Sequence, residues 1–126
     1  MNRIEINTRK SIRFGQLGDW FRNGAGTDCI EVQEMGNEDE EFLIALHEFC
    51  EWYLCKKAGV TQESVDEFDK NFKGEGEPGD DKAAPYYRQH AYATMIEALM
   101  CKELGLDWDE YLSRTNGFTT SEGVSK

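Results

Sequence analysis

The chain has 126 residues, and its 25 acidic side chains outnumber 14 lysines and arginines, which gives a formal net charge of -11 at pH 7. This charge argues against direct nucleic acid binding, which needs a basic surface, and against docking on an anionic membrane surface. Hydrophobic residues at 39% and aromatic residues at 12% suffice for the core of one domain, which argues against disorder of the whole chain.

The N-terminal residues form no apolar run of signal-peptide length, and no stretch has the roughly 18 apolar residues of a membrane span. The four cysteines form no C-x-x-C pair, which argues against a zinc ribbon or a thioredoxin-type motif. We therefore expect a cytoplasmic protein whose thiols are reduced and act as small apolar side chains.

The first third of the chain has the pattern of short strands and turns. Isoleucines alternate with charged residues over 4–6, and a similar alternation recurs over 12–14. Residues 29–32 predict a third short strand, whereas the closely spaced glycines of 15–26 indicate turns and loops. These residues predict a small N-terminal β element.

The first long helix is predicted over residues 38–58. Asn37 is a favoured N-cap, Glu40 stands where a capping box needs it, and Gly59 suits the residue after the helix. Apolar residues lie around most of the helix, so we expect it to be central in the fold. One apolar ridge is predicted to consist of Phe42, Leu46, Phe49 and Tyr53, and the next of Leu43, Cys50, Leu54 and Ala58.

Three further helices follow. One begins after Thr61, one spans about 85–104, and a short one begins at the D-x-x-E capping box of Asp107. Residues 73–84 predict a mobile loop, and residues 116–126 a flexible tail. The core stripe of the third helix is predicted to be Tyr87, Ala91, Met95, Ala98 and Leu99.

Residues 1–115 are therefore predicted to form a single domain of the α+β class. Its short N-terminal β element packs on three main helices plus a short C-terminal helix. Strands and helices do not alternate along the chain, which argues against a parallel α/β fold.

Both histidines of the chain lie in long predicted helices, beside carboxylates. His47 and Glu51 are four residues apart, so their side chains are neighbours on one helix face. Glu51 falls among apolar positions, where a carboxylate is costly to bury without a proton, a donor or a cation. On the third helix, His90 and Glu97 share a face.

An antiparallel pairing of the two long helices would bring these side chains together. We expect His47, Glu51, His90 and Glu97 to bind zinc, or iron or manganese if more oxygen ligands join. Glu48 is the candidate catalytic residue, a general base beside a metal-bound water whose pKa the ion lowers.

The run His47-Glu48-Phe49-Cys50-Glu51 resembles the active-site helix of zincin metallopeptidases, whose motif is H-E-x-x-H. The resemblance implies that His47 is the first metal ligand and Glu48 the general base. Glu51 occupies the position of the second histidine, so the usual two-histidine, one-glutamate set would be completed by His90. The chain as a whole also resembles small phage or bacterial proteins.

Three hypotheses about function remain open at this stage. The first is a small intracellular metal-binding protein acting as a metal-dependent hydrolase. The second is a non-catalytic acidic protein that binds a basic partner by mimicking nucleic acid, based on the acidic cluster of 61–81. The third is a structural protein in which the His–Glu pairs only fix helix packing. A homodimer is a further hypothesis, with Trp20, Trp52 and Trp108 as candidates for an exposed patch.

Overall fold

The computed structural model describes the backbone of residues 3–124 and the side chains of residues 3–116. It confirms the α+β class. A three-stranded sheet has the order β1-β3-β2, and the central strand is parallel to β1 and antiparallel to β2. The strands are β1 (Ile4–Arg9), β2 (Gly18–Arg22) and β3 (Asp28–Gln33).

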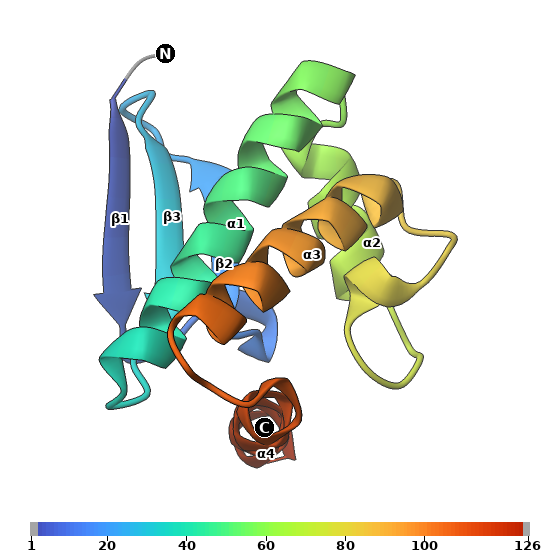
Figure 1. The fold of residues 1–126 in the computed structure, drawn as a ribbon. Helices are drawn as coiled ribbons and strands as arrows, with labels where there is room; N and C mark the ends of the chain where they lie inside the picture. The colour runs from blue at the N-terminus through green and yellow to red at the C-terminus, as the bar shows by residue number, and fades with distance from the viewer. Residues whose placement is uncertain (1–2, 125–126) are drawn as a thin grey trace.

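Four α-helices and two short 3-10 helices make up most of the remaining described chain. α1 lies between the sheet and α3, because it contacts β2 and β3 on one side and α3 on the other (Figure 1). α4 follows α3 and runs across its C-terminal end (Figure 1). The helices are η1 (Arg13–Gly15), α1 (Glu38–Ala58), α2 (Gln62–Asn71), η2 (Pro78–Asp80), α3 (Tyr87–Glu103) and α4 (Trp108–Val124).

The ends of α1 agree with the sequence prediction. The Asn37 side chain accepts a hydrogen bond from the backbone N–H of Glu40, and Gly59 has a φ of 76°, which a glycine adopts without a steric penalty. The capping box, however, is not closed by Glu40, whose carboxylate pairs with Arg114. Glu41 instead accepts hydrogen bonds from the two backbone N–H groups that precede Asn37.

The strand expected over 12–14 is wrong, because η1 occupies Arg13–Gly15 and Phe14 has a φ of 64°. The second strand is β2, which lies within the segment expected to be turns and loops. Trp20 at its centre pairs with Ile30 of β3 and is buried. Pairing and burial of this aromatic side chain outweigh the weak strand preference of the glycines nearby.

The predicted core stripe of α3 is also wrong. Met95 is 62% exposed and Leu99 is 69% exposed. The buried face of the helix instead carries His90, Ala93, Glu97 and Cys101. Periodicity identified a stripe of apolar residues, but the face turned to the interior is the one that carries the candidate site.

The apolar core consists of two clusters, one around the C-terminal half of α1 and the other around its N-terminal half. Trp20, Ile30 and Trp52 belong to the first, and Leu43 and Tyr111 to the second. Trp20 and Trp52 are therefore core residues and form no exposed patch, which corrects that expectation. Trp108 packs against the second cluster and is partly buried.

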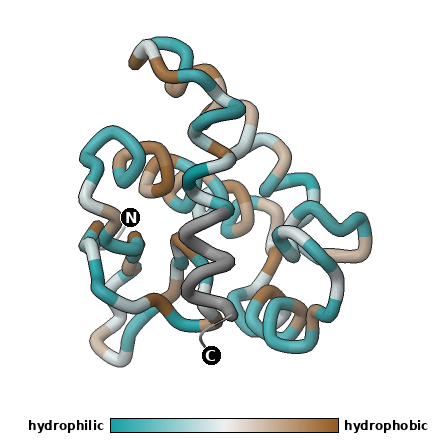
Figure 2. The backbone as a smooth tube through the Cα atoms, turned by 90° about the horizontal axis from the view of Figure 1, so that it is seen from below, coloured by the Kyte–Doolittle hydropathy of each residue, from teal (hydrophilic) through white to brown (hydrophobic). Residues whose placement is uncertain are grey.

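The segments predicted as loop and tail carry more structure than expected. Ala84 and Gly79 are buried, so residues 73–84 contribute to the interior, while their mobility stays a prediction. The tail predicted over 116–126 extends beyond the described residues, and as far as Val124 the backbone is helical. Hydrophilic residues are interspersed with hydrophobic ones along the chain (Figure 2), and no described helix is long and apolar enough to cross a membrane.

Candidate metal centre

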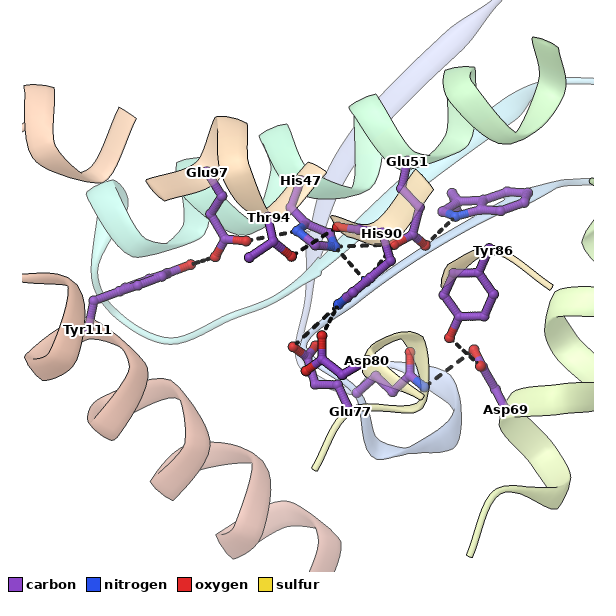
Figure 3. A network of polar contacts seen from close by, with 12 residues as sticks. His47, Glu51, Asp69, Glu77, Asp80, Tyr86, His90, Thr94, Glu97 and Tyr111 are labelled. Carbon is purple, nitrogen blue, oxygen red and sulfur yellow. Dashed lines mark hydrogen bonds and ion pairs between the residues drawn. The ribbon is translucent and has the colours of Figure 1, made fainter. Parts of the chain in front are cut away.

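Three predicted ligands meet between α1 and α3. Glu51 Oε2 lies 3.1 Å from His47 Nε2 and 2.9 Å from His90 Nδ1, and the two ring nitrogens are 3.2 Å apart. All three side chains are buried. Figure 3 shows the two imidazole rings and the carboxylate converging from the facing sides of the two helices. The predicted convergence of these residues is confirmed, and the group could hold a metal ion.

The spacing of the three atoms matches one face of a tetrahedral zinc site. Zinc bonds of about 2.0–2.1 Å at tetrahedral angles place neighbouring ligand atoms about 3.3 Å apart. The three distances of 2.9 to 3.2 Å are close to that value. Two imidazole nitrogens and one carboxylate oxygen also form the ligand set of catalytic zinc sites that leave a fourth position for water.

Glu97 lies on the far side of His47 from this group. One of its oxygens is 2.8 Å from His47 Nδ1, and the other accepts a hydrogen bond of 2.5 Å from the hydroxyl of Tyr111 (Figure 3). Both oxygens of Glu97 are therefore engaged, one with His47 and one with Tyr111, and its role as a metal ligand stays a prediction. A carboxylate on Nδ1–H of a histidine directs Nε2 toward a metal ion.

Glu51 is held by three donors. Its second oxygen accepts a hydrogen bond of 2.9 Å from the indole N–H of Trp20 on β2. Burial alone would raise the pKa of Glu51, but the hydrogen bonds from His47 and His90 lower that pKa to about 2. Glu51 is thus a carboxylate across the physiological range, as a metal ligand must be.

In the metal-free protein, the carboxylates around both histidines favour the protonated form of the imidazoles. Burial by itself lowers the pKa of His47, but the hydrogen bonds to Glu51 and Glu97 raise that pKa well above 6.5. The pKa of His90 is raised in the same way, against burial, chiefly by Glu51. The site therefore favours positive charge at its centre, whether it is supplied by protons or by an ion.

Glu48, the predicted general base, faces the same pocket from the next position on α1. A Cβ atom at Gly18 would lie only 2.5 Å from its Cγ, so the glycine leaves the space that the side chain occupies. Burial and the nearby charge of Glu51 raise the pKa of Glu48 well above its ordinary value. A raised carboxyl pKa is typical of groups that exchange protons near neutral pH.

The far side of the His90 ring faces the η2 turn. Its Nε2 lies 3.1 Å from Asp80 Oδ1 and 3.9 Å from Glu77 Oε2 (Figure 3). A Cβ atom at Gly79 would be 2.5 Å from the His90 ring, so only a glycine lets the turn pack this closely. Residues 73–84, predicted from the sequence as a mobile loop, therefore contact the candidate site directly.

A pocket of about 580 Å³ contains the candidate site. Among the described residues that line it, two histidines are present but no lysine or arginine. Its carboxylates are Asp19, Glu48, Glu51, Asp69, Glu77, Asp80 and Glu97. Asp19 forms an ion pair with Arg13, and Asp69 accepts a hydrogen bond from the hydroxyl of Tyr86. The other five carboxylates are Glu48, Glu51, Glu77, Asp80 and Glu97.

The sequence did not indicate the residues that orient the ligands. From the sequence, Trp20 is only a candidate for an exposed patch, and Tyr111 has no predicted role in the site. Their polar atoms give both residues a role there. Gly18 and Gly79 read as loop glycines. The sequence indicated that the buried carboxylate of Glu51 needs hydrogen-bond donors. It did not indicate which residue, distant in the chain, provides them.

Comparisons of the chain with protein-family models, with curated proteins and with solved structures found no match.

Proposed function

We propose that the protein is a metal-dependent hydrolase whose zinc ion is bound by His47, Glu51 and His90. The observation that carries the proposal is the buried triangle of three ligand atoms at tetrahedral spacing. The ligand atoms are Nε2 of His47, Oε2 of Glu51 and Nδ1 of His90. A bound ion supplies an acidified water and polarises the bond to be cleaved.

The orienting contacts favour a metal ion over a purely structural role. Packing histidines are satisfied by one partner on each nitrogen, but here two imidazoles and one carboxylate oxygen are all within 3.2 Å of one another. Each of the two chain-distant donors, Trp20 and Tyr111, fixes a carboxylate that contacts a histidine. This is the pattern in which outer hydrogen bonds hold metal ligands in place.

Glu48 would act as the general base. It lies in the pocket but outside the ligand group, so its carboxyl group stays available to take a proton from water. Burial and the neighbouring charge of Glu51 raise the pKa of Glu48 in the metal-free state, and a bound cation would lower that pKa again. The role is the one that the zincin resemblance implies.

The proposal is tested by metal content and hydrolysis on the same preparations, purified without a histidine tag. We expect about one tightly bound zinc per wild-type chain. His47→Ala should lose the metal and the activity. Glu48→Gln should keep the zinc and lose at least about 100-fold in the rate of hydrolysis, screened with fluorogenic peptide and ester libraries.

Glu103→Gln is a matched control, because it removes an exposed carboxylate at the end of α3 away from the ligands. It should change neither readout. A wild-type protein that takes up no zinc on titration would overturn the proposal. A protein that binds zinc at His47 but cleaves no library member would restrict the site to metal binding.

A further inference from the structure

His90 carries an unused coordinating atom. Its side chain is only 4% exposed, and among the described side chains its Nε2 is a buried nitrogen without a hydrogen-bond partner. Asp80 Oδ1 lies 3.1 Å away, yet the contact does not have the direction that an N–H donor requires. A buried polar atom without a partner is uncommon in folded proteins, so this nitrogen is available to a ligand.

We propose that Nε2 of His90, Glu77 and Asp80 form a second divalent-cation site. One ligand atom from each of these residues lies within 4.8 Å of the other two. One imidazole and two carboxylates make up a ligand set that zinc accepts, with water filling the remaining positions. The site lies at the Nε2 edge of the His90 ring, whereas the first ligand group lies at its Nδ1 edge (Figure 3).

The η2 turn presents the two carboxylates in a fixed arrangement. The backbone N–H of Asp80 donates to the carbonyl of Glu77 at 3.1 Å, which closes the turn and brings both side chains to the same end. Gly79, between them, packs against the His90 ring. The two carboxylates are exposed in the metal-free protein, so an ion can reach them from solvent.

The charge of the pocket also favours a second ion. Among the described carboxylates of the pocket, only Asp19 pairs with an arginine, and no described lysine or arginine lines the pocket. One divalent ion in the first site would therefore leave several carboxylates without a cationic partner. An excess of negative charge therefore persists at the mouth, where Glu77 and Asp80 lie. A second divalent ion removes most of that excess.

Two ions would share His90. With Nδ1 bound to the first ion and Nε2 to the second, the ring must lose both of its N–H protons. Filling the second site therefore releases one further proton to solvent. The inference concerns ion binding and stands whether or not the first site is hydrolytic.

The test is a zinc titration by equilibrium dialysis, with metal counted by mass spectrometry and proton release followed with a pH indicator. Wild-type protein should bind two zinc ions per chain at saturation. The double variant Glu77→Gln/Asp80→Asn should bind one and should lose the late proton release. His47→Ala should lose the first ion but keep the second, which separates this proposal from the proposed function.

Glu75→Gln/Asp81→Asn is the matched control. It removes two carboxylates from the same loop, and neither belongs to the group around His90. This control should bind two ions, as the wild type does. Saturation of the wild type at one ion would overturn the second site, as would a second ion that survives Glu77→Gln/Asp80→Asn or disappears in the control.

Discussion

Glu97 contacts His47 from outside the proposed ligand group, so we expect it to influence metal binding. The carboxylate accepts from Nδ1–H of His47 and so leaves Nε2 for the ion. We expect Glu97→Gln to weaken zinc binding about 10- to 100-fold, because an amide oxygen is a poorer acceptor and makes the imidazole less basic. Competition with a chromophoric chelator measures the zinc Kd of each variant.

Tyr111→Phe provides the comparison for that experiment. It removes the hydrogen bond to the other oxygen of Glu97 but leaves the contact with His47. Its effect on zinc affinity should be smaller than that of Glu97→Gln. Equal zinc affinity in Glu97→Gln and wild type would show that Glu97 does not act on the site through His47.

The two histidines also predict a pH dependence of the metal-free protein. The pKa of His47 is raised well above 6.5 and that of His90 is also raised, so the folded chain holds these protons more tightly than the unfolded chain does. Their contribution to the free energy of unfolding is therefore complete below about pH 6.5, and it is lost as the pH rises through the raised pKa values.

Thermal unfolding in the presence of a chelator tests this sign. The Tm of the metal-free wild type should fall as the pH is raised above about 6.5, and His47→Gln/His90→Gln should flatten the fall. Zinc affinity should change in the opposite direction, because fewer protons then compete for the nitrogens. A metal-free Tm that rises over the same range would contradict the prediction.

At the scale of elements, β2 and α1 meet where Gly18 faces Glu48. A Cβ atom at this glycine would lie 2.5 Å from Cγ of Glu48 and 2.8 Å from Cγ2 of Ile44. Gly18→Ala should lower the free energy of unfolding by about 1–3 kcal/mol and displace Glu48. We expect hydrolysis to fall while the tightly bound zinc is retained.

Gly24→Ala is the control for that substitution, since no atom lies within 4 Å of its added Cβ. Denaturant unfolding and metal content should be unchanged in this variant. If Gly18→Ala had wild-type stability and activity, the close approach of β2 to α1 would have no bearing on Glu48.

The elements differ in how well the sequence predicts them, and the difference has a physical reason. α1 was predicted over its full length because its ends are set locally, by Asn37 and Gly59. The buried face of α3 could not be predicted in this way. Hydrophobic periodicity assumes that apolar residues face inward, whereas in α3 the inward-facing residues include His90 and Glu97. The candidate ligands could be found because buried charge in a helix is unusual.

The contacts that complete the site depend on tertiary structure and could not be predicted. Trp20 reaches Glu51 across 31 residues, and Asp80 reaches His90 through a turn that the sequence marks only by its glycines. No local pattern encodes such pairings. The convergence of α1 and α3 was predicted only as a consequence of assuming that they pack as an antiparallel pair.

At the scale of the whole molecule, a bound ion links two helices that otherwise meet through buried polar groups. An ion that binds only the folded state raises the free energy of unfolding by about 2.7 kcal/mol at a free concentration 100 times its Kd. For a chain of this size that corresponds to a Tm increase of roughly 10 °C. Differential scanning fluorimetry with and without zinc measures the shift.

The net charge of -11 requires a control, because any divalent cation screens an acidic protein. Magnesium should give a small Tm increase of similar size in wild type and His47→Ala, since magnesium prefers oxygen ligands and keeps its water. Zinc should give a clearly larger increase in wild type than in His47→Ala, which keeps only the second site. If both variants respond equally to zinc, the first site adds nothing to the stability, and binding of a basic partner becomes the better account of the acidic surface.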